Sequence, residues 1–195
     1  MSKKLGDITT IIKDNVGDIT ITADQHAIDA VNFLSNLFPL AKIDSTKTTT
    51  ANQNYITAPT GLIRVLRITI AGVEIDKLPD LDYLQYSEDN DLQRWYEFDG
   101  KIMFAENFSV TGQVVKIWYD GSYVVPTSVV DTDVPDEMME LVYAGGTYRY
   151  YRKMVSVVAV AREIYPNVTV DQITKIRDQW FKELQSLITQ LKTNR

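Results

Sequence analysis

Hydrophobic residues recur with a helical period near both ends of the chain. The first twenty residues give a weak helical pattern. Residues 22–39 give a stronger one, with Thr22 as the expected N-cap and Pro39 as the end of the helix. The members of its single apolar stripe are Ala27, Ala30, Val31, Leu34 and Phe38.

A second helical region begins at Pro135, which fits the first helical position. Gly145 and Gly146 fall in the middle of this helix and cost about 2 kcal/mol in helix propensity against two alanines. We therefore expect close packing of these glycines against the stripe that contains Ala27 and Ala30, where a side chain would not fit.

The last helix is predicted after Thr169, which forms a capping box with Gln172. Its apolar positions follow the helical period over more than five turns. They are Ile173, Ile176, Trp180, Leu184, Leu187 and Leu191.

The middle of the chain alternates short β-branched or aromatic runs with turn signals, one of which is Gly72. The clearest signal is Asp99-Gly100 between two apolar runs, which predicts a hairpin with a type I′ turn. In this hairpin Trp95 should face Phe104 and Tyr96 should face Met103. Both of its faces are apolar, so we expect it to be covered on both sides.

These elements predict an α+β fold. Residues 1–44 and 134–195 should form a helical bundle or hairpin with a long C-terminal helix. Residues 45–133 should form an inserted antiparallel β-meander or small β-sandwich, and the whole should be a single composite domain.

Composition narrows the function classes. The 195 residues include no cysteine, which excludes a disulfide scaffold and a thiolate metal site. The net charge of −6 argues against a general DNA-binding protein, since such proteins gain affinity from Lys and Arg. No apolar run has the length of a membrane span, and no signal peptide is expected.

Candidate chemistry is sparse. His26 is the only histidine, and a single helical histidine is most often a structural residue. The carboxylates between positions 131 and 137 miss the EF-hand pattern, which would require Gly at position 136 and Glu at position 142. Their simpler role is to stabilise the helix start at Pro135. These acidic residues are Asp131, Asp133, Asp136 and Glu137.

The carboxylate pairs Asp80/Asp82 and Glu88/Asp89 are typical of an acidic surface loop. No Gly-rich phosphate loop is present, since "AGGTY" lacks both the required spacing and a following Lys. We therefore predict no enzyme, no catalytic residue, no cofactor and no bound metal.

The segment "YRYYRK" interleaves aromatic and basic residues and is a candidate for a surface that faces DNA or a ring neighbour. Three of its cations fall on one side of a helix. The alternative is a solvated face whose aliphatic stems cover apolar surface. The residues concerned are Arg149, Tyr150, Arg152 and Lys153.

The order of these segments resembles the head-to-tail adaptor (neck ring) proteins of tailed bacteriophages. "YITAPTGLIRVLRITIAG", residues 55–72, is similar to the family's YxLPxxFxRVxxVxxxG stretch, with Thr57-Ala58-Pro59 in place of Leu-Pro. The aromatic-Gly hairpin and the strand "VVKIWYDGSY" follow, and then Val134-Pro135-Asp136-Glu137 begins the helix. The resemblance covers about residues 22–155.

The resemblance implies a structural virion protein without catalysis. Such proteins form a ring, usually of twelve copies, below the portal protein, and extend the DNA channel toward the tail. The implied partners are the portal, neighbouring copies, a tail hub or further ring proteins, and passing genomic DNA without sequence recognition. The implied location is the neck of the virion, after assembly in the host bacterial cytoplasm, with no membrane involved.

The last helix has two readings of equal weight. It can dock to the portal as a helix in a groove, or it can be the third helix of the bundle core. The residues at issue are Trp180, Phe181, Leu184, Leu187 and Leu191.

Two rival functions fit the same composition. One is another phage tail-completion or tail structural protein, which would tend to have more strand and less C-terminal helix. The other is a carbohydrate-binding β module, which would present aromatic residues on a sheet and usually carry an export signal.

Overall fold

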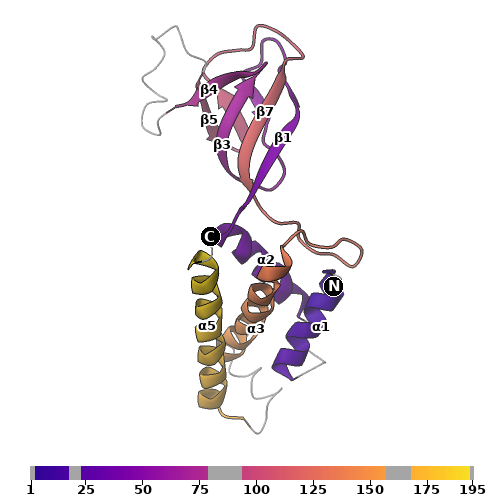
Figure 1. Ribbon diagram of the computed structural model, residues 1–195, viewed down its shortest axis with the longest axis vertical. Helices are drawn as coiled ribbons and strands as arrows, with labels where there is room; N and C mark the ends of the chain where they lie inside the picture. Colours follow the sequence, from indigo (N-terminus) through magenta and orange to yellow (C-terminus); the bar gives the residue numbers. More distant parts are fainter. Residues whose placement is uncertain (1–2, 18–22, 79–93, 157–167, 194–195) are drawn as a thin grey trace. The chain divides into compact units, whose positions relative to one another are not determined.

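The computed structural model describes residues 3–17, 23–78, 94–156 and 168–193, and it has an α+β fold (Figure 1). The chain divides into two compact units. The helical unit consists of Met1–Phe38 and Tyr123–Arg195, and the β unit of Pro39–Ser122. The β unit is thus inserted into a helical unit to which both parts of the chain contribute, with boundaries at 38/39 and 122/123 where we had predicted 44/45 and 133/134.

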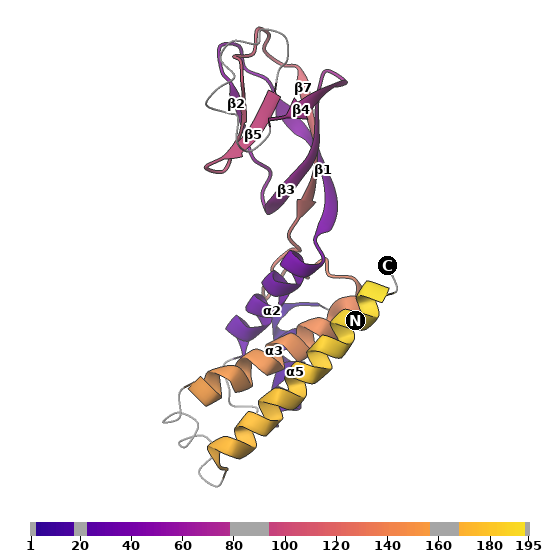
Figure 2. The same ribbon diagram turned by 90° about the vertical axis from the view of Figure 1, so that its left-hand side faces the viewer.

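The long helix α3 is central to the helical unit, since α1, α2 and α5 all pack against it. Figures 1 and 2 show α3 and α5 side by side along most of their length. The elements of this unit are α1 (Leu5–Val16), α2 (Asp24–Leu37), the short 3₁₀ turn η1 (Asp136–Met138), α3 (Met139–Ser156) and α5 (Val170–Thr193).

The helix starts differ in part from the predictions. Ala23, not Thr22, precedes the first residue of α2, and Thr22 itself lies outside the described residues. Pro135 is the N-cap of η1 and not the first helical residue, because its ψ of 147° is extended. The predicted capping box is confirmed, since the Gln172 side chain accepts from the Thr169 N–H at 2.8 Å.

The two glycines of α3 meet different neighbours. A Cβ on Gly145 would lie 3.5 Å from Cβ of Ala30 and 4.0 Å from Leu184, which is ordinary contact. A Cβ on Gly146 would overlap the terminal methyl of Ile12 and lie 3.5 Å from the His26 carbonyl oxygen. A side chain is therefore excluded at Gly146, but by Ile12 of α1 and not by the predicted stripe of α2. Gly145 does face Ala30 of that stripe, and the predicted exclusion is wrong there.

The β unit is one curled sheet of seven strands, in the order β1-β7-β3-β4-β5-β6-β2. All neighbours pair antiparallel except β4 and β5, which pair parallel. The strands are β1 (Leu40–Thr48), β2 (Tyr55–Thr57), β3 (Leu62–Ile70), β4 (Val73–Lys77), β5 (Arg94–Phe98), β6 (Lys101–Phe104) and β7 (Val114–Gly121).

The sheet departs from a consecutive antiparallel meander at three places. Strand β2 lies beside β6 and not between β1 and β3. Strand β7 pairs with both β1 and β3, and turn residues carry no signal for such distant pairing. Residues 78–93 separate β4 from β5, and a connection of that length permits a parallel pair. Local turn signals therefore predicted the strands but not their order in the sheet.

The β unit has its own apolar core inside the curl of the sheet. The Trp95 indole N–H donates to the Ile75 carbonyl at 3.0 Å, so the largest core side chain is also satisfied as a donor. Other buried members are Ile56, Val65, Ile68, Ile102, Phe104, Phe108, Val115 and Ile117.

The predicted hairpin is confirmed in turn and register. Asp99 and Gly100 have φ of 45° and 69°, Trp95 pairs with Phe104, and Tyr96 pairs with Met103. Ala71-Gly72 forms a second such turn between β3 and β4. The prediction that both hairpin faces are covered is wrong, because Phe98 on the outer face is 65% exposed.

Substituting each glycine of α3 by alanine should have opposite effects on stability. Gly145→Ala gains about 0.5–1 kcal/mol, because helix propensity improves and the methyl group fits. Gly146→Ala loses about 1–3 kcal/mol through the overlap with Ile12. Urea denaturation measures both, and the cost of Gly146→Ala should be smaller in an Ile12→Val background, which lacks the overlapping methyl. Equal effects of the two substitutions would contradict the packing described.

The hairpin turn can be tested at Gly100, whose Cβ position is open, so only the backbone resists substitution. Gly100→Val should cost about 1–3 kcal/mol, because a β-branched residue is strained at positive φ. Gly100→Asn is the matched control and should cost less, since Asn tolerates this region. Similar unfolding midpoints for the two variants would argue against the turn.

Candidate interaction surfaces

Helix α5 divides its apolar residues between the core and the surface. Leu184 is buried against Gly145, and Ile173 is buried as well. The Phe181 ring lies 5.3 Å from the Tyr148 ring and stays 41% exposed. Three further predicted residues are half-buried, and these are Trp180, Leu187 and Leu191. The helix therefore contributes to the core through Leu184 while keeping an accessible apolar margin.

The basic segment of α3 does not form a single exposed surface. Arg149 lies 3.9 Å from the Asp29 carboxylate and 5.6 Å from the Phe33 ring centre, so it faces α2. Arg152 and Lys153 are exposed, as predicted. The prediction is wrong for Tyr150, which is buried because its position on α3 turns it toward α2.

Tyr150 contacts the only histidine. The two rings meet edge to face with centres 6.0 Å apart. Burial lowers the pKa of His26, the nearby Lys153 and Arg149 lower it further, and Asp29 opposes them. His26 is therefore a neutral core residue at pH 7.

The acidic residues before α3 bond to the chain's own backbone and to Lys3. The Asp131 carboxylate accepts from the Lys3 N–H at 3.1 Å, and the Asp133 carboxylate accepts from the Val124 N–H at 2.5 Å. The Lys3 ammonium lies 2.7 Å from the Asp136 carboxylate and lowers its pKa. Among the described residues, no group of His, Cys, Asp and Glu is arranged to hold a metal ion.

The segment 124–134, here called the valine loop, is an apolar surface that the sequence analysis missed. Val129 is 77% exposed. The loop is nevertheless fixed, because the Leu5 N–H donates to the Thr127 carbonyl at 3.0 Å and the Thr132 N–H donates to the Lys3 carbonyl at 3.2 Å. Its exposed apolar residues are Val124, Val125, Val129 and Val130. The Val-Val pairs on either side of Pro-Thr-Ser are the one signal in the sequence that marks it.

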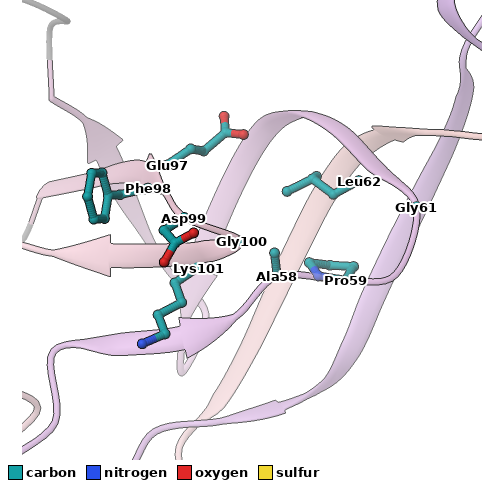
Figure 3. Close-up of a pocket in the computed structure, with 9 residues that line it drawn as sticks. All are labelled: Ala58, Pro59, Gly61, Leu62, Glu97, Phe98, Asp99, Gly100 and Lys101. Carbon is teal, nitrogen blue, oxygen red and sulfur yellow. The ribbon is translucent and has the colours of Figure 1, made fainter.

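The β unit has an open notch of about 430 Å³ between the Asp99-Gly100 turn and the loop at Pro59 (Figure 3). The Ala58 N–H donates to the Gly100 carbonyl at 3.1 Å and ties the two sides together. The charged side chains around the notch have neighbours elsewhere in the unit. Glu97 lies 3.8 Å from Lys77, and the Lys101 ammonium lies 4.3 Å from the centre of the Tyr55 ring.

The outer face of β3 and β7 carries the half-buried Trp118. The Arg67 guanidinium lies 5.0 Å from its ring centre and 2.7 Å from the Glu74 carboxylate. A guanidinium in this position covers part of the indole face, which a sugar ring would otherwise stack on.

The carboxylate pairs Asp80/Asp82 and Glu88/Asp89 lie outside the described residues. Within the described part of the chain, no helix combines the length and apolar character needed to cross a membrane.

Comparison with known proteins gives no assignment. No protein-family model matches the chain, and no curated protein matches it.

Two alanine substitutions can separate the core residue of α5 from its accessible apolar margin. Leu184→Ala should cost about 2–5 kcal/mol in the free energy of unfolding, because it opens a cavity beside Gly145. Phe181→Ala should cost about 1 kcal/mol or less, because it loses mainly one ring contact. Thermal and urea unfolding of both variants test this. A larger loss of stability for Phe181→Ala than for Leu184→Ala would show that α5 packs on α3 through Phe181 and not through Leu184.

Proposed function

We propose that the chain is a structural protein of a tailed-bacteriophage virion. In this role it is a head-to-tail adaptor that forms a ring, usually of twelve copies, below the portal and extends the DNA channel to the tail. The observation that carries the proposal is the order of the segments. A β unit with the family-like stretch of residues 55–72 is inserted into a helical unit that both flanking parts of the chain build.

The charge of the chain suits a ring through which DNA passes. At −6 per chain, twelve copies carry a formal charge of about −72. Acidic walls repel a phosphate backbone and do not hold it, so DNA can move through without sequence recognition. Arg152 and Lys153 are exposed cations available for local contact with DNA or an acidic partner.

The apolar margin of α5 supports a contact with the portal. Trp180, Leu187 and Leu191 are half-buried, so a groove on another protein can cover what α3 leaves accessible. The hairpin at Asp99-Gly100, with its exposed Phe98, offers a second contact surface for ring neighbours, a tail hub or further ring proteins.

The proposed role requires no catalysis and no cofactor. The protein would assemble in the host bacterial cytoplasm and remain in the neck of the virion.

The direct test mixes the purified chain with the portal protein of the same phage and examines the product by electron microscopy and native mass spectrometry. We expect a ring of this chain stacked on one end of the portal. Leu187→Ala should weaken the complex by about tenfold or more, since it removes apolar contact area. Thr189→Ala on the exposed side of the same helix is the matched control.

Other outcomes identify the rival functions. Binding to the tail tube or tail tip with no affinity for the portal would replace the adaptor role with a tail structural one. Binding to glycans with no affinity for any virion protein would indicate a carbohydrate-binding module.

A further inference from the structure

The helical unit carries its charges unevenly along α3. Residues 123–148 contain five carboxylates and no lysine or arginine. From Arg149 to the end of α3 the chain has three lysines or arginines and no carboxylate. The valine loop is therefore next to an acidic end, and the second half of α3 is basic.

The acidic end is only partly neutralised. Lys3 pairs with Asp136, but Glu137 and Glu140 have no ion pair within the described residues, and both are exposed. The four exposed valines thus lie beside negative charge that the helical unit itself leaves uncompensated.

The basic end carries a partly exposed aromatic surface, here called the basic seam and formed by Tyr148, Arg152 and Phe181. Tyr148 and Arg152 are four residues apart on α3 and so lie on the same side of the helix. The Phe181 ring packs on Tyr148 from α5. Arg152 is exposed and has no ion pair within the described residues.

The two surfaces are well separated within one chain. Arg152 is thirteen residues after Met139 along α3, which amounts to roughly 20 Å of helix. The valine loop is held at the first end by its bonds to Lys3 and Leu5, so it cannot fold back onto the seam.

We propose that the valine loop of one copy docks on the basic seam of the next copy. The apolar valines would cover Phe181 and Tyr148, and the acidic residues beside the loop would face Arg152. Two valine loops would instead bring like charges together, so charge complementarity favours the unlike pair. When copies join through two different surfaces, the assembly keeps one free valine loop at one end and one free seam at the other. It closes into a ring when the rotation between neighbouring copies brings these two ends together. This inference rests on the proposed ring and names its lateral contact.

The absence of cysteine in the chain permits a direct test by cross-linking. Ser128→Cys marks the valine loop and Gln185→Cys marks the seam, one helical turn after Phe181. Both positions are exposed, and both substitutions leave the valines and the aromatic residues in place. The two full-length variants are mixed at high concentration and treated with a short bis-maleimide. The control replaces Ser128→Cys with Ser109→Cys, an exposed serine of the β unit.

We expect a mixed cross-linked dimer with about a tenfold higher yield than the control pair gives, because a specific contact raises the effective concentration of the two thiols. The yield should fall at high salt, because screening weakens the charge contact. Val129→Asp added to the Ser128→Cys chain should reduce the yield to that of the control. Its melting temperature serves as the folding check, and Val129 is exposed enough for the fold to tolerate the change.

Three results would overturn the inference. The first is a yield equal to the control, and the second is cross-linking of Ser128→Cys mainly to itself. The third is ring formation on the portal by the Val129→Asp chain at the wild-type level, which would leave the adaptor role intact. The expected cross-link in a protein that never binds a portal would keep the contact between copies and remove the adaptor role.

Discussion

The helical unit depends on the close approach of α1 to α3 at Gly146. Gly146 lets α3 lie against Ile12 of α1 and the His26 carbonyl of α2, where no side chain fits. Gly145, on the neighbouring side, meets Ala30 of α2 and Leu184 of α5. The bare backbone at Gly146 therefore sets the distance of α1 from α3, while at Gly145 the contacts with α2 and α5 leave room for a methyl group.

Sequence reasoning worked where the cause of the structure is local. Asp99-Gly100 specifies its turn because both residues must adopt positive φ, and the register of Trp95 and Tyr96 follows from the turn length. It was incomplete where the cause is distant. The glycine pair predicted a close approach, but propensity alone does not say whether Ala30 or Ile12 is the neighbour. The place of β7 between β1 and β3 has no local signal for the same reason.

In the candidate surfaces too, local features could be predicted from the sequence and features caused by distant residues could not. Arg152 and Lys153 are exposed, as helical geometry suggests, but Tyr150 is buried because α2 packs on that side of α3. The valine loop was not recognised because apolar residues in a segment between a strand and a helix indicate burial as readily as exposure. Its exposure is maintained by bonds to Lys3 and Leu5, which are far away in the sequence.

The insertion of the β unit into a split helical unit also affects the order of events during synthesis. All strands of the β unit fall within residues 39–122, so this unit can fold as soon as that stretch has left the ribosome. The helical unit must wait, since Lys3 pairs with Asp131 across 128 positions and Leu184 is made well after the β unit. Helices α1 and α2 therefore lack their partners α3 and α5 while the β unit is made. The valine loop can be fixed to Lys3 and Leu5 once residue 134 exists, whereas the basic seam also needs Phe181. One of the two surfaces of the proposed contact between copies therefore forms well after the other.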